Sequence, residues 1–199
     1  ERLGLKIGDT VIVSRAGDVI PKITKVLKEL RTGQEKSFHM PVRCPIDNSE
    51  VVKSGVAYRC SNPQCSAVQR ESLYHFVSRH AFNIEGLGPK IIDRFLDEGL
   101  ISDATDIVTL KKGYIEVLER FGEKSAENII NEVQLRKKIT LPKFIYSLGI
   151  LHVGEETGTL LSRQFPAVDI KELIKKYEKL SLEDLQKVPD IGPTVSESI

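Results

Sequence analysis

The three cysteines of this 199-residue chain lie close together, between Cys44 and Cys65. Cys60 and Cys65 enclose four residues, and Cys44 stands 16 residues before Cys60. Zinc ribbons hold their metal with two pairs of ligands, and the members of each pair are two to four residues apart. A disulfide framework normally uses an even number of cysteines spread along the chain. The cluster therefore predicts a metal site in a reducing compartment.

Asp47 occupies the position where a zinc ribbon would have its fourth thiolate, in the segment Cys44-Pro-Ile-Asp47. A carboxylate is an accepted zinc ligand. His39 is an alternative fourth ligand at a different spacing. We expect a zinc ion held by Cys44, Asp47, Cys60 and Cys65, with Asp47 preferred over His39. Two other interpretations stay open, a zinc-less knuckle held by packing and a stray pair of thiols.

A second candidate site, separate from the cysteine cluster, is a repeated turn found at four places where an apolar residue is followed by glycine. They are Leu87-Gly88, Phe121-Gly122, Val153-Gly154 and Ile191-Gly192, at intervals of 34, 32 and 38 residues. Four positions after each glycine stand Ile92, Ala126, Gly158 and Ser196, and seven positions after it stand Phe95, Ile129, Leu161 and Ile199. Spacings of four and seven fall on one face of a helix. Each glycine is therefore predicted to precede a helix that packs through this face, closely where the residue is small.

The predicted unit is helix, tight glycine turn, helix. We expect the glycine to take a positive φ and to let another backbone come close. The free N–H groups of the following helix then form an anion site, and Lys90 and Lys124 lie two residues beyond their glycines. A glycine can also simply end a helix, and a helical repeat can bind protein. The fourfold match favours the repeat, and the turn chemistry favours a phosphate of nucleic acid.

The charge distribution agrees with binding through backbone amides. The chain has a net charge of +1, and residues 1–43 carry nine Lys/Arg against five Asp/Glu. Residues 81–140 carry nine against 11, and residues 141–199 carry seven against nine. The predicted turns therefore lie in regions without a basic excess, where bulk charge would not hold DNA. No run of 18 apolar residues predicts a membrane helix, the first nine residues do not resemble a signal peptide, and both ends look cut from a larger chain.

The pattern of secondary structure divides the chain into three parts. Residues 5–30 alternate branched residues with Gly and Asp, which predicts strands of a small sheet or barrel with Pro21 at an edge or bulge. About 30 residues cannot form a stable barrel alone, so we expect its remainder upstream. A polar connector leads to residues 41–68, a small module with a metal in place of a core. From Gln69 onward the chain reads as helices, giving an α+β fold that is mostly α.

Eight segments carry a resemblance that covers essentially the whole chain. They are RAGDVIP (15–21), MPVRCP (40–45), RCSNPQC (59–65), ESLYHFVSR (71–79), NIEGLGPKII (83–92), FGEKSAENI (121–129), LGILHVGEET (148–157) and IGPTVSESI (191–199). In this order the segments resemble bacterial NAD⁺-dependent DNA ligase. The resemblance implies the end of an oligonucleotide-binding (OB) fold at 1–40, a zinc finger at 41–68 and a helix-hairpin-helix domain at 69–199. Its motifs are expected near 84–95, 119–130, 151–162 and 189–199.

The resemblance also implies a partner, nicked double-stranded DNA, held by its minor groove and its phosphates. Val19 and Ile20 are expected in the minor groove and Arg15 near the backbone. The full set of expected DNA-binding residues is Arg15, Val19, Ile20, Gly86, Gly88, Lys90, Gly122, Lys124, Ser125, His152, Gly154, Thr157 and Gly192. The zinc cysteines of the family fall at positions 44, 47, 60 and 65, and this chain departs from them at Asp47.

A ligase of this family adenylates itself from NAD⁺, passes AMP to a 5′-phosphate and joins the 3′-hydroxyl with Mg²⁺. The active-site lysine of the family lies in a Lys-x-Asp-Gly motif, which this sequence does not contain. We therefore expect no catalytic residue in this chain, no activity of the chain alone, and partners in the adenylation and BRCT domains of a bacterial cytoplasmic ligase. The alternatives are a helix-hairpin-helix arm of another DNA repair protein and a protein-interaction array. His75 and His80 are expected to pack against helices.

Overall fold

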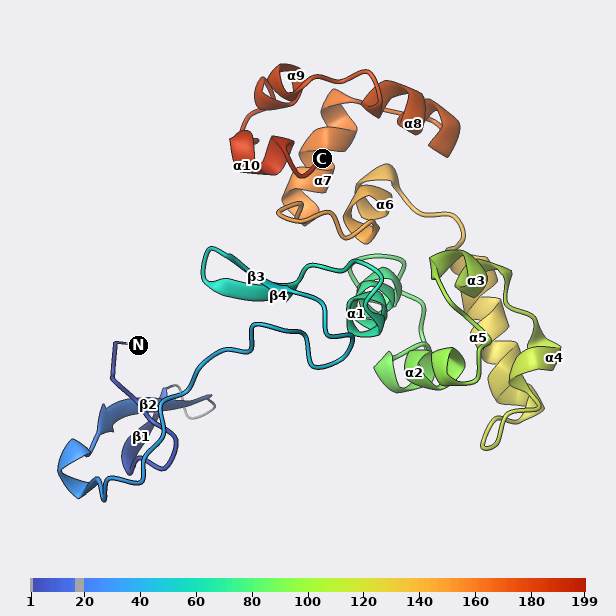
Figure 1. The fold of residues 1–199 in the computed structure, drawn as a ribbon. Helices are drawn as coiled ribbons and strands as arrows, with labels where there is room; N and C mark the ends of the chain where they lie inside the picture. Colours follow the sequence, from blue (N-terminus) through green and yellow to red (C-terminus); the bar gives the residue numbers. More distant parts are fainter. Residues whose placement is uncertain (1, 17–19) are drawn as a thin grey trace. The chain divides into compact units, whose positions relative to one another are not determined.

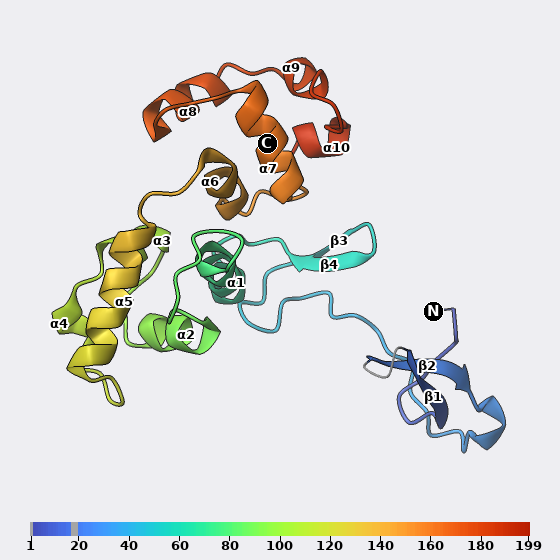
Figure 2. The same ribbon diagram turned by 180° about the vertical axis from the view of Figure 1, so that it is seen from behind.

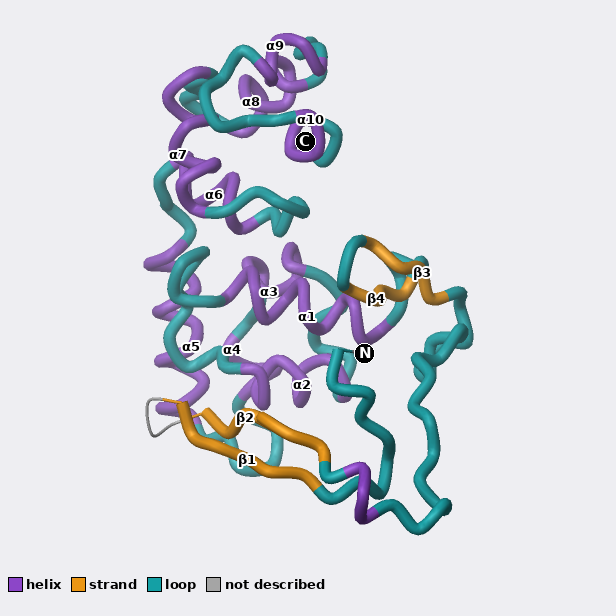
Figure 3. Tube along the Cα trace, turned by 90° about the vertical axis from the view of Figure 1, so that its left-hand side faces the viewer, coloured by secondary structure: helices purple, strands orange, loops and turns teal. Residues whose placement is uncertain are grey.

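The computed structural model describes residues 2–16 and 20–199. The chain divides into two compact units, Glu1–Asn62 and Pro63–Ile199. In the described residues, strands β1 to β4 come first and helices α1 to α10 follow (Figure 1). Figure 3 shows the strands confined to two hairpins, with only helix and loop after them. The expected mostly helical α+β fold is confirmed.

The first hairpin pairs β1 (Val11–Ala16) with β2 (Ile20–Val26) in antiparallel register. Pro21 lies opposite Arg15, and the register shifts between Ile12 and Val13. Strands were therefore expected correctly in this region. Ile12, Val13 and Ile20 are exposed in this two-stranded sheet, and an isolated two-stranded hairpin is at best marginally stable.

The connector after β2 is tied back to the start of the chain. It begins with a 3₁₀ turn at Lys28–Leu30, and Ile7 and Lys36 form an antiparallel bridge. Arg31 donates through Nε and one terminal nitrogen to the two oxygens of Asp9, at 2.6 and 2.7 Å. These bonds with Arg31 lower the pKa of Asp9 to about 2. A bidentate pair of this kind fixes orientation as well as charge, so the segment is held in place although its composition is that of a linker.

The second hairpin was not expected from the sequence. Strands β3 (Val51–Ser54) and β4 (Ala57–Cys60) pair antiparallel around Gly55, which has φ +61°. The available signal was Gly55 standing between two short runs of strand-forming residues, a pattern typical of a tight hairpin. The hairpin matters for the site, because Cys60 is the last residue of β4.

The second unit is a succession of short helices. They are α1 (Ser66–Val77), α2 (Pro89–Asp97), α3 (Ala104–Thr109), α4 (Lys112–Ile115), α5 (Glu123–Arg136), α6 (Leu141–Ser147), α7 (Glu155–Gln164), α8 (Ile170–Tyr177), α9 (Leu182–Gln186) and α10 (Pro193–Ser196). Figure 2 shows α6 and α7 side by side from behind. No helix of the described residues is long and apolar enough to cross a bilayer.

Two apolar clusters hold these helices together. One joins α1 to α5 and contains the fully buried Phe95 and Ile115, and the other joins α6 to α10 around Leu161. Positions four and seven after the turn glycines face these clusters, and all of them are buried except Ile199, which is half-buried. The predicted helix face is therefore confirmed.

Gly158 shows why small residues were needed on this face. A Cβ added there would lie 2.9 Å from the carbonyl oxygen of Pro142 on α6. Real Cβ atoms do not approach an oxygen so closely, because close-packed interiors leave no room for an extra methyl group. Gly158 therefore sets how near α7 comes to α6.

Polar contacts fix α1 against its neighbours. Arg70 donates to Asp93 at 2.5 Å and to Asp97 at 2.6 Å on α2, and the Tyr74 hydroxyl donates to Asp93. The ring of His75 lies 4.6 Å from that of Tyr146 on α6 at a tilt of 57°, and its Nε2 lies 2.7 Å from the Tyr146 carbonyl oxygen. His75 thus packs against a helix as expected.

Candidate nucleic-acid interface and metal centre

The four glycine turns share one backbone geometry. In each, the N–H of the residue before the glycine donates to the carbonyl three residues earlier. These bonds are Leu87 to Ile84 at 3.3 Å, Phe121 to Leu118 at 3.0 Å, Val153 to Ile150 at 3.0 Å and Ile191 to Val188 at 3.2 Å. The residue two places before each glycine has a positive φ, which is +84° for Gly86, +71° for Arg120, +67° for His152 and +65° for Asp190. The repeat seen in the sequence is thus a repeat of tight turns.

The expectation that Gly88, Gly122, Gly154 and Gly192 themselves take positive φ is wrong. They are the N-cap residues of α2, α5, α7 and α10, with φ between −71° and −106°. Any residue can adopt this extended backbone. The turn already reverses the chain at the residue two places earlier, so the glycine is left to start the helix.

Internal packing does not require these four glycines either. A Cβ added to any of them would meet no atom within 4 Å in the described residues. Gly158, the fourth residue of α7, differs from them because a Cβ there would lie 2.9 Å from the Pro142 carbonyl oxygen. Glycine is a favoured N-cap residue, and its missing Cβ also leaves the backbone open to the close approach of a ligand.

The helices after the turns begin without side-chain caps. The N-cap of α2, α5, α7 and α10 is glycine, which has no side chain, and no side-chain cap is found there among the described residues. By contrast, Asp103, Asp169 and Ser181 cap α3, α8 and α9. Uncapped N–H groups at the positive end of a helix favour an anionic partner. Three other helices, α1, α4 and α6, also begin without such a cap. A missing cap therefore indicates an anion site only where the N-cap glycine also has open space beside it.

The charge near the helix starts differs between the turns. Lys90 is the second residue of α2 and Lys124 the second of α5. Glu123 at the start of α5 pairs with Lys112 at 2.8 Å, and this hydrogen bond lowers the pKa of Glu123. Two acidic residues open α7, and the first of them, Glu155, lies 2.9 Å from Nδ1 of His80. The first two turns are therefore better suited to a phosphate than the third.

The expected DNA-binding residues of the helical region gather at these turns. Gly86 and His152 hold the positive-φ positions, and Ser125 and Thr157 are the third residues of α5 and α7. In the first hairpin, Arg15 lies on β1 and Ile20 begins β2 with 68% of its surface exposed. Val19 lies outside the described residues.

Four polar residues of this region were missed by sequence reasoning. Arg120 and Asp190 occupy the same turn position as His152, and the spacing of two before the N-cap glycine was the signal. Asn128 and Asn131 of α5 line a cavity of about 480 Å³ together with Gly86 and Ser125. Ser125, Asn128 and Asn131 follow one another at intervals of three, which places them on one side of the helix.

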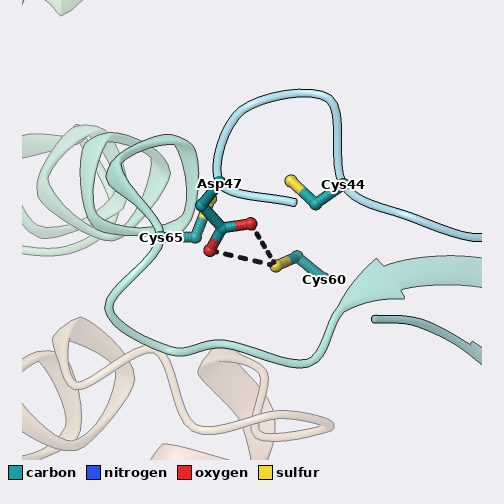
Figure 4. A group of neighbouring side chains, drawn as sticks. All are labelled: Cys44, Asp47, Cys60 and Cys65. Atoms are coloured by element: carbon teal, nitrogen blue, oxygen red, sulfur yellow. Dashed lines mark hydrogen bonds between the residues drawn. The ribbon is translucent and has the colours of Figure 1, made fainter. Parts of the chain in front are cut away.

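The second candidate site brings together the four residues expected to hold metal. One ligand atom from each of Cys44, Asp47, Cys60 and Cys65 lies within 4.8 Å of every other (Figure 4). Four ligands around zinc at 2.3 Å lie about 3.8 Å apart, so the donor set fits a tetrahedral ion with small adjustments. His39 is exposed and does not belong to this group.

Backbone geometry positions each of these ligands. The Cys44 carbonyl accepts from Asn48 N at 2.9 Å, and Cys44 N donates to Ser49 O at 2.8 Å. Asn48, directly after Asp47, has φ +60° and closes this turn. Cys60 ends β4 and Cys65 precedes α1. The two halves of the site therefore come from a tight turn and from the link between a strand and a helix.

The Asp47 carboxylate is held as an anion. Its Oδ1 accepts from Ser49 N at 3.0 Å, and its Oδ2 accepts from Ser49 Oγ at 3.0 Å and Asn62 Nδ2 at 2.8 Å. The hydrogen bond from the Ser49 amide is the largest cause that keeps the pKa of Asp47 well below its usual range, and Asn62 adds to it. A charged oxygen is thus available beside the thiols.

Cys60 lies next to this carboxylate, with its Sγ 3.6 Å from Asp47 Oδ1. The Asn62 amide favours the thiolate, but burial and the nearby Cys44 and Asp47 raise the pKa of Cys60 to about 11. Without a cation the thiol keeps its proton at neutral pH. A metal ion would have to displace that proton, which makes binding weaker at low pH.

Comparison with known proteins gives consistent matches along the chain. Residues 1–35 match the NAD-dependent DNA ligase OB-fold domain, residues 79–135 a SAM-like helix-hairpin-helix tandem, and residues 143–199 a helix-hairpin-helix motif. A protein named DNA ligase from Desulfitobacterium hafniense is 43% identical over 197 residues, covering 98% of this chain and 29% of the relative. DNA ligases of Coxiella burnetii and Geobacter metallireducens are 45% and 44% identical over 201 residues, covering all of this chain and 29% of each relative.

Proposed function

Because the chain belongs to the NAD-dependent DNA ligase family and spans 29% of the length of the relatives it matches, we propose that it is the DNA-clamping region of a nick-sealing ligase. In this proposal residues 1–40 are part of the OB fold, residues 41–68 are a zinc finger and residues 69–199 are the helix-hairpin-helix domain. The ligand is nicked double-stranded DNA.

The observation that carries the proposal is the open space at the four N-cap glycines. A phosphate can approach the helix starts there without meeting a Cβ, and the free N–H groups can donate to its oxygens. Contacts of this type position a protein on the duplex without reading its sequence. We therefore assign the DNA contacts to Gly88, Gly122, Gly154 and Gly192 and to the polar residues beside them, with the first two turns strongest because of Lys90 and Lys124.

The remaining predicted contacts complete the clamp. Gly86 and His152 shape their turns, Ser125 and Thr157 add hydroxyl donors, and Arg15, Val19 and Ile20 meet the minor-groove side. The match of residues 1–35 to the ligase OB fold supports a ligase over another repair scaffold.

The metal part of the proposal is one zinc ion held by Cys44, Asp47, Cys60 and Cys65. Four protein ligands leave no open position, which is the mark of a structural site. Bound zinc would supply folding energy to a segment with few buried apolar residues. This site takes no part in catalysis.

The chemistry of ligation lies outside this chain in our proposal. The whole ligase uses NAD⁺ and Mg²⁺ for nick sealing in replication and repair in the bacterial cytoplasm, together with its adenylation and BRCT domains. The chain alone is expected to bind DNA and to transfer no AMP. NAD⁺-dependent adenylation of the isolated chain would contradict this.

The test is the affinity of the chain for a nicked duplex, measured by fluorescence anisotropy. Gly122→Val places a branched side chain where the phosphate would lie, and we expect a loss of about tenfold, equivalent to 1.4 kcal/mol. Gly113→Val is the matched control, because Gly113 lies in α4 beside the same turn and a Cβ there meets only the Glu116 side chain at 4.0 Å. Equal affinities of the two variants would contradict phosphate binding at this turn, and no binding by the unmodified chain would favour a protein-interaction array.

A further inference from the structure

A carboxylate differs from a thiolate in what it requires as a metal ligand. A thiolate offers one sulfur atom, whereas a carboxylate offers two oxygens with about four lone pairs that must be oriented. Partners outside the ligand set usually supply that orientation. Position 47 holds the carboxylate of this site, so a hydrogen-bond partner of Asp47 can select which of its two oxygens faces the metal. A thiolate has one sulfur and offers no such choice.

Asn62 touches both halves of the proposed site. Its side-chain Nδ2 donates to Asp47 Oδ2 at 2.8 Å, across 15 residues of sequence. Its backbone N–H donates to Cys60 Sγ at 3.4 Å. Asn62 is half-buried, so these bonds are partly shielded from competing water.

The two oxygens of Asp47 accept unequal numbers of hydrogen bonds from nitrogen and oxygen donors. Oδ2 accepts from Ser49 Oγ and Asn62 Nδ2. Oδ1 accepts from Ser49 N, and the Cys60 sulfur lies 3.6 Å from Oδ1 and 3.8 Å from Oδ2. Oδ1 therefore accepts fewer hydrogen bonds from nitrogen and oxygen donors than Oδ2 does, which leaves it more lone-pair capacity for a metal ion.

We infer that Asn62 is a positioning residue for the metal centre, whose side-chain amide holds Oδ2 of Asp47 so that Oδ1 can serve as the fourth ligand. Ser49 belongs to the same turn as Asp47 and can hold the carboxylate only relative to that turn. Asn62 holds it relative to Cys60 and the other half of the site. The inference rests on the proposed zinc centre and deepens it.

The test compares Asn62→Ala in two backgrounds, the natural chain and Asp47→Cys. Zinc affinity is measured for the 199-residue chain by competition with a chromophoric chelator. In the natural background we expect a loss of about tenfold or more, the usual effect of removing a partner of a metal ligand. In the Asp47→Cys background the loss should nearly vanish, because a thiolate at position 47 has no second oxygen for the amide to hold. Ser61→Ala, an exposed neighbour, should change neither background.

A second measurement covers variants whose affinity falls below the range of the chelator. With excess Co²⁺, the visible absorption bands report the ligand set, and Asn62→Ala should shift them in the natural background alone. Equal losses in the two backgrounds, or no loss in the natural one, would overturn the role of Asn62. A natural chain that takes up no zinc while Asp47→Cys does would instead overturn the zinc proposal itself. DNA binding by the glycine turns is independent of either result.

Discussion

The cysteine cluster and the glycine turns offer charge to a ligand by opposite means. At residues 44–65, side chains from distant positions converge, and backbone amides orient them. At the four turns, side chains are absent from the key position, and the backbone itself faces outward. A convergent site fails when one member is lost, whereas a repeated site loses one contact of several. Changes at the cluster should therefore have the larger and more local effects.

The largest effect is expected from Cys65→Ser. Cys65 is 1% exposed, and a serine hydroxyl is a much poorer zinc ligand than a thiolate. Zinc content, measured by elemental analysis with thiol titration, should fall from one per chain to near zero. Limited proteolysis should then cut within residues 41–62 while the helical circular dichroism is kept. Undiminished zinc in this variant would remove Cys65 from the ligand set.

A pair of glycines in one helix separates binding from stability. Gly158→Val should lower the free energy of unfolding by roughly 2–3 kcal/mol, because its side chain meets the Pro142 carbonyl and overpacking has a cost of this size. Gly154→Val should cost about 1 kcal/mol or less, the usual price of a poor N-cap, yet weaken DNA binding. Urea unfolding and DNA anisotropy on both variants make the comparison. A reversed order of the two stabilities would contradict the packing described for α7.

The lysines beside the first two turns should show as a salt effect. Lys124→Ala removes a cation from the second position of α5, and we expect the slope of log affinity against log salt to fall by about one. Lys179→Ala, outside the turns, serves as the control for loss of charge. Identical slopes for Lys124→Ala and the unmodified chain would mean that Lys124 does not lie at a phosphate.

The smallest effect is expected where the turn holds a strained residue. Arg120 has φ +71°, a conformation that costs a residue with a Cβ about 1–2 kcal/mol. Arg120→Gly should therefore raise the free energy of unfolding by roughly 1 kcal/mol. Arg120→Ala keeps the strain and should give no such gain. A gain of the same size in both variants would point to the lost charge instead of the backbone.

Much of the helical unit could be predicted because its signal is periodic. Burial of Ile92, Ala126 and Leu161 follows from spacing alone, since a helix brings every third or fourth residue to one face. The positive φ could not be placed in the same way. Arg120, His152 and Asp190 carry it with ordinary side chains, so no residue type marked the position, and the glycines drew attention to the wrong place.

The metal cluster was predictable as a set of residue types but not as a structure. The spacing of the cysteines predicted them as metal ligands. Asp47 was predicted as the fourth ligand because it stands where a zinc ribbon would have its fourth thiolate. The contact between Asn62 and Asp47 joins residues 15 apart, which local patterns do not encode. The β3–β4 hairpin that brings them together was also missed, because it buries few apolar residues and shows little alternation.

The central claim is that backbone amides at the glycine turns hold the DNA phosphates. Titration of ¹⁵N-labelled chain with a nicked duplex tests it directly by amide chemical shifts. We expect the largest shifts at Gly88 and Gly122 and in the first residues of the helices that follow, smaller shifts at Gly154 and Gly192, and Gly113 nearly unchanged. Saturable binding that leaves these amides unmoved and shifts other residues, such as the lysines of α8, would contradict the account.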